Sequence, residues 1–520
     1  MAMRTTLLAL LLIAAIAAYW IETSFLRTNI AHHTDIWKNY GAELAWDGKR
    51  PLNVLFMSWG SRGDHQPNVA MALELAKLGH KVIVLGLEKY KHIIEQHEPA
   101  ILYRPLYDDY IINLINNQVP KGDDDGDDPI KSITQYSFNS SEQLVNQYID
   151  SALSTLPEEH GGGEIDVLFG SYAPPILLHH ITVAETIKKP LFLLTHDPFL
   201  PSESYSVNPD EGRCVDNGRR ANVLLSHIGS TLFGFMFTFG ETPWRKLRRD
   251  LGVKTNFPFF RFTHHKYLVN FPIFDTSETN LWPRPNDWPS HWYATGFFEM
   301  PKDSKQEFDG GNELQLWIDE RKEKFNRPLL FFGQGSFTSL DRVAMTQILI
   351  DTCERLQMDA VALATTIDFD GRPPPPFIKV VKEADLSSVF PQCSVIVHHG
   401  GGGTSSQVIR SGTPGVCMPF FLFQNNWGAQ LRDIGAGTLV DTKEIRDAWN
   451  KNETNLLLDA VEEVMELDVQ KAAAELGLKA RESRAGGVQF AAKKTIEILQ
   501  AYQNRVSNLK KDQSALKDDF

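Results

Sequence analysis

The segment from Val395 to Gln424, VIVHHGGGGTSSQVIRSGTPGVCMPFFLFQ, constrains the fold of this chain more than any other stretch. It begins with three β-branched apolar residues, which is typical of a buried parallel strand. Two histidines and four consecutive glycines follow. Thr404 and Ser405 are residue types that begin helices, and Gly412 is placed to end one. The segment therefore predicts a strand, a glycine loop and a helix, which is the unit of an α/β domain.

A glycine loop at the start of a helix is suited to binding a diphosphate. Glycines let an anionic group approach the backbone N–H groups, and the helix N-terminus adds positive potential. No Lys-Ser/Thr pair follows the glycines, so the loop is neither a Walker loop nor a G-x-G-x-x-G fingerprint. A flexible surface loop is the alternative, but the flanking strand and helix favour a site formed by His398, His399, Gly400, Gly401, Gly402, Gly403, Thr404 and Ser405.

A second strand–turn–helix unit lies near the start of the chain. Asn53 to Met57 reads as a strand, and WGSRGD follows as a turn. We expect a helix from Pro67 to Leu78 and then a strand from Val82 to Leu87. Asp64 and His65 would stand at the carboxyl end of the first strand, where open α/β sheets bind ligands. A turn residue or a helix cap is the alternative for Asp64.

These motifs resemble those of the UDP-glycosyltransferase superfamily, which has GT-B architecture. HHGGGGTSSQ is similar to its HHGGAGT signature, and GSRGDHQP resembles the GSRGDVQP motif that opens its acceptor domain. The motifs are most similar to those of the sterol glucosyltransferases and glycopeptide-antibiotic glycosyltransferases, from about Asn53 onward. The resemblance implies an α/β protein with two Rossmann-like, doubly wound parallel-sheet domains that face a cleft.

The resemblance also implies inverting transfer of a sugar from a nucleotide-sugar, with a UDP-sugar expected, to an acceptor hydroxyl, without metal or cofactor. Asp64 matches a catalytic aspartate, and His65 is a second base beside it. His399 matches a histidine that contacts phosphate, and Thr404 matches its hydroxyl partner. Gly335 and Ser336 resemble a G-x-GS turn at the donor diphosphate. The full donor site would also include Gly63, His398, Gly400, Gly401, Gly402, Gly403, Ser405, Phe423 and Gln424.

Phe423 departs from the family pattern. The family usually has Asp-Gln or Glu-Gln after PFF, with both side chains on sugar hydroxyls, whereas here Phe423 precedes Gln424. Phenylalanine accepts no hydrogen bond, so a donor with a hydroxyl at that point would bind less well. We expect either a donor that lacks this hydroxyl or a compensating contact from Asn425, Asn426 or Trp427.

The acceptor is expected to be lipophilic, such as a sterol, a terpenoid or another secondary metabolite. Residues 224–239 are rich in phenylalanine, and we expect Phe233 and Phe237 to line the acceptor site together with His196, at the end of a strand. Core packing and a membrane-surface contact are alternatives for the aromatic segment, and a structural role is the alternative for His196.

Residues 5–21 contain no charged side chain and end beside Tyr19 and Trp20. A helix of this length approaches the thickness of a bilayer core. We therefore expect residues 1–26 to be a single-pass N-terminal anchor in the endoplasmic reticulum membrane, and a cleaved signal peptide is the alternative.

The remaining boundaries follow from composition. We expect a linker at 27–51, an acceptor-binding domain at 52–300, an interdomain linker at 301–326, a donor-binding domain with C-terminal helices at 327–505 and a polar tail at 506–520. The net charge of −13 argues against a nucleic-acid partner. The four cysteines have no metal spacing, and we expect free thiols.

Two other functions compete with the glycosyltransferase. An inactive sugar-nucleotide-binding partner subunit would explain the loss of the acid at Phe423. A sugar-nucleotide epimerase of the same architecture would need neither a membrane anchor nor an apolar acceptor wall, so it fits less well.

Overall fold

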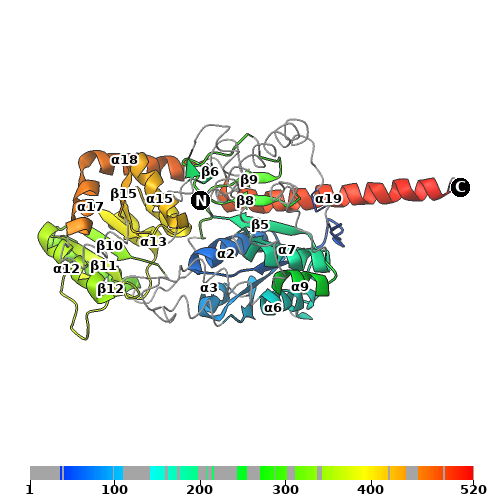
Figure 1. The fold of residues 1–520 in the computed structure, drawn as a ribbon, viewed down its shortest axis with the longest axis horizontal. Helices are drawn as coiled ribbons and strands as arrows, with labels where there is room; N and C mark the ends of the chain where they lie inside the picture. Colours follow the sequence, from blue (N-terminus) through cyan, green and yellow to red (C-terminus); the bar gives the residue numbers. More distant parts are fainter. Residues whose placement is uncertain are drawn as a thin grey trace, which may run out of the picture.

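The computed structural model describes residues 36–37, 40–97, 99–108, 141–158, 162–172, 176–196, 206–207, 214–215, 243–253, 270–286, 288–300, 311–335, 342–419, 422–440, 455–483 and 486–518. The described chain forms two lobes, each built on its own parallel sheet, and a long C-terminal helix that runs along the first lobe and beyond it (Figure 1).

The first sheet contains seven described strands in the order β3-β2-β1-β4-β5-β8-β9, and all of its neighbouring pairs are parallel. The strands are β1 (Asn53–Met57), β2 (Lys81–Leu87), β3 (Ile101–Leu106), β4 (Val167–Ser171), β5 (Leu191–Thr195), β8 (Ile273–Asp275) and β9 (Trp292–Ala294). The helices of this lobe are α2 (Arg62–Lys77), α3 (Lys91–Glu95), α6 (Ser141–Leu153), α7 (Ile176–Ile187) and α9 (Pro243–Asp250). A separate antiparallel pair joins β6 (Ser206–Val207) to β7 (Cys214–Val215).

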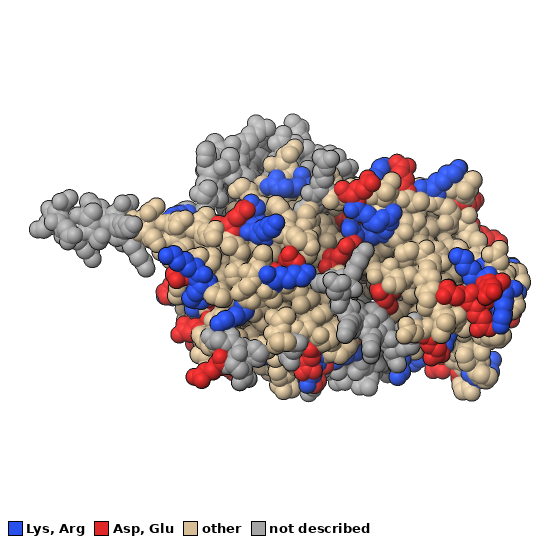
Figure 2. Space-filling view, turned by 180° about the vertical axis from the view of Figure 1, so that it is seen from behind, with Lys and Arg blue, Asp and Glu red and all other residues tan. Residues whose placement is uncertain are grey.

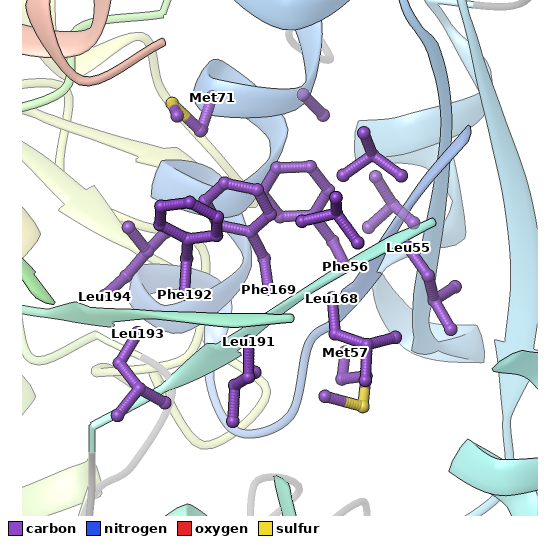
Figure 3. Packing of buried hydrophobic residues seen from close by; sticks show 14 of the residues in the cluster. Leu55, Phe56, Met57, Met71, Leu168, Phe169, Leu191, Phe192, Leu193 and Leu194 are labelled. Carbon is purple, nitrogen blue, oxygen red and sulfur yellow. The ribbon is translucent and has the colours of Figure 1, made fainter. Parts of the chain in front are cut away.

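Aromatic rings from neighbouring strands form a ladder across the first sheet. Phe56 stacks on Phe169 with ring centroids 4.5 Å apart, and Phe169 stacks on Phe192 at 5.2 Å. Figure 3 shows these rings on the face that α2 covers with Met71, while Leu168 points to the opposite face. Such cross-strand pairs fix the register of adjacent strands, and therefore fix which residues reach the carboxyl edge of the sheet together.

The second sheet has six described strands in the order β12-β11-β10-β13-β14-β15, again all parallel. The strands are β10 (Leu329–Gly333), β11 (Asp359–Leu363), β12 (Ile378–Val381), β13 (Val395–His398), β14 (Gly415–Cys417) and β15 (Gly437–Leu439). The helices of this lobe are α11 (Gly311–Phe325), α12 (Arg342–Leu356), α13 (Leu386–Val389), α14 (Gly402–Ser411), α15 (Leu422–Asp433), α17 (Asn455–Met465) and α18 (Leu467–Arg481), and α19 (Gly487–Asp518) returns to the first lobe. Both strand orders are those of Rossmann-like sheets, as predicted.

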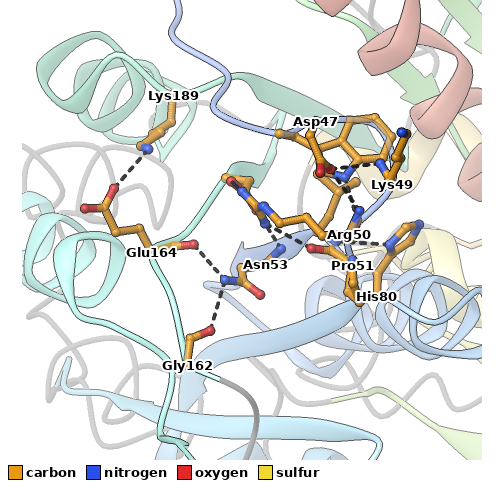
Figure 4. A network of polar contacts seen from close by, with 12 residues as sticks. Asp47, Lys49, Arg50, Pro51, Asn53, His80, Gly162, Glu164 and Lys189 are labelled. Carbon is orange, nitrogen blue, oxygen red and sulfur yellow. Dashed lines mark hydrogen bonds and ion pairs between the residues drawn. The ribbon is translucent and has the colours of Figure 1, made fainter.

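The segment before β1 is part of the first domain rather than a linker. Trp37 is fully buried in the core of that domain, and its indole N–H donates to the carbonyl of Leu191 at 2.8 Å. Arg50 forms two hydrogen bonds with the carboxylate of Asp166, at 2.7 and 2.8 Å. Figure 4 shows Arg50 within a wider network that includes Asn53. Residues 36–37 and 40–52 therefore close the amino edge of the sheet, and the predicted linker at 27–51 is too long.

Three further boundaries differ from the prediction. Residues 311–325, expected in the interdomain linker, form α11, whose Leu314 and Ile318 pack in the second domain with Phe331. The start of α19 packs in the core of the first domain, where Ala491 and Leu499 are fully buried. Because α19 continues to Asp518, most of the predicted polar tail is helical.

The helix after β1 begins a turn earlier than expected. Pro67 was expected to open it, but α2 starts at Arg62 with Ser61 as its N-cap, so Pro67 lies inside the helix. In the same way, α14 begins at Gly402 rather than at Thr404. In both cases the N-cap residue lies in the turn that follows the strand, so the helix begins closer to the edge of the sheet than expected.

The described helices include none that is both long and apolar enough to cross a membrane. The predicted anchor at residues 1–26 lies outside the described residues. Figure 2 shows acidic and basic side chains interspersed over the face that it presents. Cys353, Cys393 and Cys417 are buried free thiols, which confirms the expectation for these three cysteines.

Candidate active site

The glycine segment forms the start of α14, directly after β13. Gly401 is the N-cap, and the first helical hydrogen bond runs from the N–H of Ser405 to the carbonyl of Gly401 at 2.8 Å. The N–H groups of the preceding turn have no acceptor within the helix, as at every helix start. They point out of the carboxyl edge of the second sheet, which is the geometry of an anion site.

Gly400 and Gly335 are required by the backbone. Both have positive φ values, +80° at Gly400 and +72° at Gly335. A Cβ at Gly400 would come within 2.5 Å of the carbonyl oxygen of Gln424, and one at Gly335 within 2.5 Å of the His399 ring. These two positions bring Gln424 and His399 against the glycine loop.

The close approach of the two domains requires a glycine at Gly402 but not at Gly403. A Cβ on Gly402 would lie 3.1 Å from the carbonyl oxygen of His196, which belongs to the first domain. A Cβ on Gly403 would lie 4.0 Å from the Cα of Gly63, an ordinary contact. The start of α14 therefore meets the carboxyl edge of the first sheet at His196 and Gly63, and we call this contact the domain junction.

The two histidines before the glycines differ in environment. His398 has no exposed surface, and its Nδ1 accepts the N–H of Gly400 at 3.2 Å. The buried His398 ring therefore holds the glycine loop in place through this hydrogen bond. This corrects its expected place among the side chains that contact the donor. His399 is half-buried, with its ring between Gly335 and Gly401. Burial lowers the pKa of His399 to about 4, so the ring is neutral at pH 7.

Asp64 lies in the first turn of α2 and caps that helix. Its Oδ2 accepts the N–H of Ser61 at 2.6 Å and the hydroxyl of Ser61 at 2.9 Å, which completes a capping box. Gly60, at φ +108°, leaves the space for this carboxylate, because a Cβ there would come within 2.5 Å of Oδ2. Asp64 remains partly exposed beside the domain junction. Both interpretations of Asp64 therefore hold, as a cap and as a polar group at the sheet edge.

His65 is a structural residue, contrary to the expectation of a second base. It has no exposed surface. Its Nδ1 lies 2.9 Å from the carbonyl of Ser61, and its Nε2 accepts the N–H of Leu87 at 3.2 Å. With both ring nitrogens used and burial lowering its pKa, His65 is held neutral between α2 and β2. The sequence placed it one residue from Asp64, but the helix turns it inward.

His196 comes from the far side of the same edge. It follows β5, and its Nδ1 lies 3.0 Å from the hydroxyl of Thr276, after β8. Its Nε2 is buried and has no hydrogen-bond partner in the described part of the chain. Burial lowers the pKa of His196, and the charge of Asp64 works in the opposite direction. Sequence inspection did not single out Thr276, which is separated from His196 by eighty residues.

An ion pair crosses between the domains beside this site. Arg62, in the first turn of α2, donates to Glu383 of the second domain at 3.0 Å, and His92 lies 3.7 Å from the same carboxylate. On the other side of α14, Arg410 contacts Glu278 at 3.4 Å and Glu299 at 2.7 Å. Both ion-pair clusters join α2 or α14 to the opposite domain, and no motif in the sequence pointed to either.

Four predicted site residues cannot be placed. Ser336, Phe233 and Phe237 lie outside the described residues, and so does the side chain of Phe423, although its backbone is in the first turn of α15. Gln424 is half-buried beside Gly400. Trp427 is fully buried and packs edge-on against Trp282 of the first domain with centroids 4.7 Å apart, so it is not placed to compensate for Phe423. Within the described residues, no group of three or more His, Cys, Asp or Glu side chains is arranged to bind a metal ion.

The chain has sequence relatives among glycosyltransferases, although no protein-family model matches it. It is 25% identical to a sterol 3-beta-glucosyltransferase of Saccharomyces cerevisiae (strain YJM789) over 419 residues, which are 77% of this chain and 32% of the relative. A sterol 3-beta-glucosyltransferase of Arabidopsis thaliana is 23% identical over 401 residues, covering 74% of this chain and 59% of the relative. The chain thus spans about a third of the length of the yeast relative.

Solved structures share the fold. A calicheamicin glycosyltransferase matches with a TM-score of 0.59 and 14% identity, over 87% of this chain and 99% of that one. The glycosyltransferase VinC, in complex with dTDP, matches with a TM-score of 0.51 and 14% identity, over 86% and 100% of the two chains. Two Rossmann-like domains that meet through a glycine-rich helix start define the GT-B fold, and this chain has it. Its sequence relatives are sterol 3-beta-glucosyltransferases, and this likeness supports the predicted resemblance to the UDP-glycosyltransferase superfamily.

Proposed function

We propose that this protein is an inverting glycosyltransferase that moves a sugar from a nucleotide-sugar to the hydroxyl of a lipophilic alcohol, with sterols as the first class to test. One observation carries the proposal most directly. The open N-terminus of α14, an anion site, lies against His196 of the first domain, next to Asp64. A donor diphosphate and an acceptor hydroxyl could therefore be held on opposite sides of one reacting carbon.

The second domain supplies the leaving-group site. Departure of a nucleoside diphosphate develops negative charge, and preorganised N–H groups at a helix start stabilise it. We propose that the N–H groups of Gly402, Gly403 and Thr404 bind the diphosphate together with neutral His399. Ser336 remains a proposed contact. No step of this binding requires a metal ion or a cofactor.

The first domain supplies the acceptor site and the base. An alcohol is a weak nucleophile until its proton is removed during attack. Among the described residues, Asp64 and His196 are polar groups of the first domain that lie at or beside the domain junction and can accept a proton, so we propose that deprotonation occurs between them. Phe233 and Phe237 remain proposed acceptor contacts. The names of the sterol 3-beta-glucosyltransferase relatives support a sterol-like acceptor.

A purely binding subunit is the weaker proposal. It would need the anion site of α14 but no polar group opposite to it, whereas here Asp64 lies opposite, together with the Nε2 of His196, which has no partner among the described residues. Phe423 favoured that alternative, yet a changed sugar preference accounts for it equally well.

The experiment is a donor and acceptor panel with the purified chain. UDP-, dTDP- and GDP-sugars are each incubated in three separate reactions, with a sterol, with a terpenoid alcohol and without an acceptor. The products are identified by mass spectrometry. We expect one donor to give an acceptor-plus-sugar product. His399→Leu, which removes a proposed phosphate contact, should lower the yield. Donor binding without any product would support the inactive subunit instead.

We also propose that residues 1–26 anchor the protein in the endoplasmic reticulum membrane, on the strength of the uncharged stretch at 5–21. The test is flotation with lipid vesicles. The full chain should float and a chain beginning at residue 27 should not, while both bind donor equally. Equal flotation of the two chains would contradict the anchor.

A further inference from the structure

His196 is positioned by two elements that are distant in sequence. It follows the last residue of β5, where register with β8 places Thr195 beside Asp275. Its Cβ lies 3.6 Å from the position that a Cβ on Gly402 would occupy. The side chain therefore leaves the backbone directly opposite the first turn of α14, where the donor diphosphate is proposed to bind.

The hydroxyl of Thr276 fixes the tautomer of this ring. Thr276 Oγ1 donates to the carbonyl of Thr195 at 3.1 Å, and a hydroxyl has only one proton. The bond between Thr276 Oγ1 and His196 Nδ1 at 3.0 Å must therefore be donated by Nδ1–H. A neutral imidazole with its proton on Nδ1 carries a lone pair on Nε2.

Nε2 of His196 is an acceptor without a donor. It is buried, and no described residue forms a hydrogen bond to it. An unpaired buried acceptor is unfavourable, so such groups in native folds are usually completed by water or a ligand. An O–H group at the domain junction would complete this one.

The other candidate bases are either engaged in hydrogen bonds or placed away from the acceptor side of the domain junction. Both ring nitrogens of His65 have partners, and His398 has no exposed surface. Oδ2 of Asp64 already accepts two hydrogen bonds from Ser61. His399 lies on the donor side of the junction, in the glycine loop.

We propose that His196 is the general base of the transfer and that Asp64 is a positioning residue that stabilises the protonated ring. This inference rests on the glycosyl transfer proposed above and identifies the group that takes the proton of the acceptor hydroxyl. The acceptor O–H proton moves to Nε2 as the oxygen bonds to the anomeric carbon. The bond from that carbon to the diphosphate oxygen breaks, and its electron pair leaves with the nucleoside diphosphate. The imidazolium, stabilised by the Asp64 carboxylate, later releases the proton to water.

The charged surroundings of the ring are simple among the described residues. From α2 the facing group is Asp64, which favours the protonated ring. From the segment after β8, Asp275 is turned onto Ser277, whose hydroxyl lies 2.7 Å away. From α14 the first turn offers glycines, and its N-terminal dipole disfavours the protonated ring. Burial lowers the pKa of His196, so the ring is neutral and ready to accept a proton at pH 7.

The test compares three variants with the wild type, using the donor and alcohol identified above. His196→Gln and His196→Ala should each lose about a hundredfold or more in kcat, the usual worth of a general base. Added imidazole should restore part of the activity of His196→Ala. UDP binding measured by calorimetry should be unchanged in each, which shows that the variants are folded.

The Asp64→Asn variant distinguishes the role of Asp64 from that of His196. If His196 is the base, this variant keeps measurable turnover, and the acid limb of its pH profile moves to lower pH, because the charge that raised the pKa of His196 is gone. Imidazole should not restore its activity.

Two results would overturn the assignment. One is a His196→Ala variant that binds UDP and turns over within about threefold of wild type, far less than a base contributes. The other is an Asp64→Asn variant with no turnover beside a largely active His196→Gln. Either leaves glycosyl transfer intact, whereas a wild type that glycosylates no alcohol contradicts the proposed function itself.

Discussion

Single atoms decide how closely the two domains approach. Gly402 and Gly403 are adjacent in the first turn of α14, but only a Cβ on Gly402 would press on the first domain, at 3.1 Å from the His196 carbonyl. We predict that Gly402→Ala weakens kcat/KM while Gly403→Ala, with its nearest contact at 4.0 Å, changes it little. Steady-state kinetics of the pair is the measurement. Equal effects would show that the junction is looser than described.

Phe423 is predicted to set the choice of donor sugar. If it occupies the place of the family acid, Phe423→Asp adds an acceptor for sugar hydroxyls, and a hydrogen bond to a charged group contributes about 1.5–3 kcal/mol. The variant should shift preference toward UDP-glucose over its 4-deoxy or 6-deoxy analogue, measured as a ratio of kcat/KM values. A wild type that already prefers UDP-glucose, with a ratio unchanged in the variant, would place this side chain away from the sugar.

At the scale of single residues, the glycine loop and Asp64 could be located from the sequence, because their residue types and their positions directly after a predicted strand are characteristic. It misassigned His65 and His398, because one residue of shift along a helix or strand turns a side chain from the edge into the core. Thr276 was out of reach, since its pairing with His196 depends on β5 and β8 lying side by side.

At the scale of elements, α14 is joined to the segment after β8 by a buried carboxylate. Glu278 is 1% exposed, and burial raises its pKa to about 7 from 4.5, while Arg410 works in the opposite direction. The folded state therefore keeps this proton to higher pH than the unfolded chain. Its contribution to stability is complete below pH 4.5 and is lost as pH rises to about 7.

We predict that Glu278→Gln flattens this part of the stability profile. Across the window the free energy of unfolding of the wild type should fall relative to that of Glu278→Gln by about 3 kcal/mol at most, at roughly 1.4 kcal/mol per pH unit of pKa shift. Urea unfolding at several pH values measures it. A difference between wild type and variant that does not change with pH would contradict the raised pKa.

The strands were predictable because parallel strands buried on both faces read as apolar runs, as in Val395 to Val397. The helix starts were not, because Ser61 and Gly401 cap α2 and α14 through contacts that close only in the folded turn. The early start of α2 is also what places Asp64 in a capping box.

At the scale of the whole molecule, the C-terminal helix α19 leaves the second domain and packs against the first. Leu499 of α19 is fully buried in the first domain, although α19 follows the second domain in sequence. We predict that Leu499→Ala destabilises the protein by about 2–5 kcal/mol, as expected for a core leucine. Leu478→Ala, at a 50% exposed position in α18, is the matched control and should change stability little. Chemical denaturation measures both, and similar midpoints would contradict the docking of α19.

This return could not be predicted from the sequence, because an amphipathic helix does not reveal which domain covers its apolar face. The same limit applied to Trp37 and Trp46, which looked like linker residues and belong to the core. The GT-B architecture itself was predictable, because the two strand–glycine–helix motifs resemble those of the UDP-glycosyltransferase superfamily.

The central claim is inverting transfer at the domain junction, and the anomeric configuration of the product tests it most directly. The chain is incubated with its preferred α-linked nucleotide-sugar and a sterol, and the coupling constant of the anomeric proton is read by NMR. Attack by the acceptor hydroxyl from the His196 side, opposite the diphosphate held by α14, predicts a β-glycoside. An α-glycoside, or free sugar in place of any glycoside, would contradict the account.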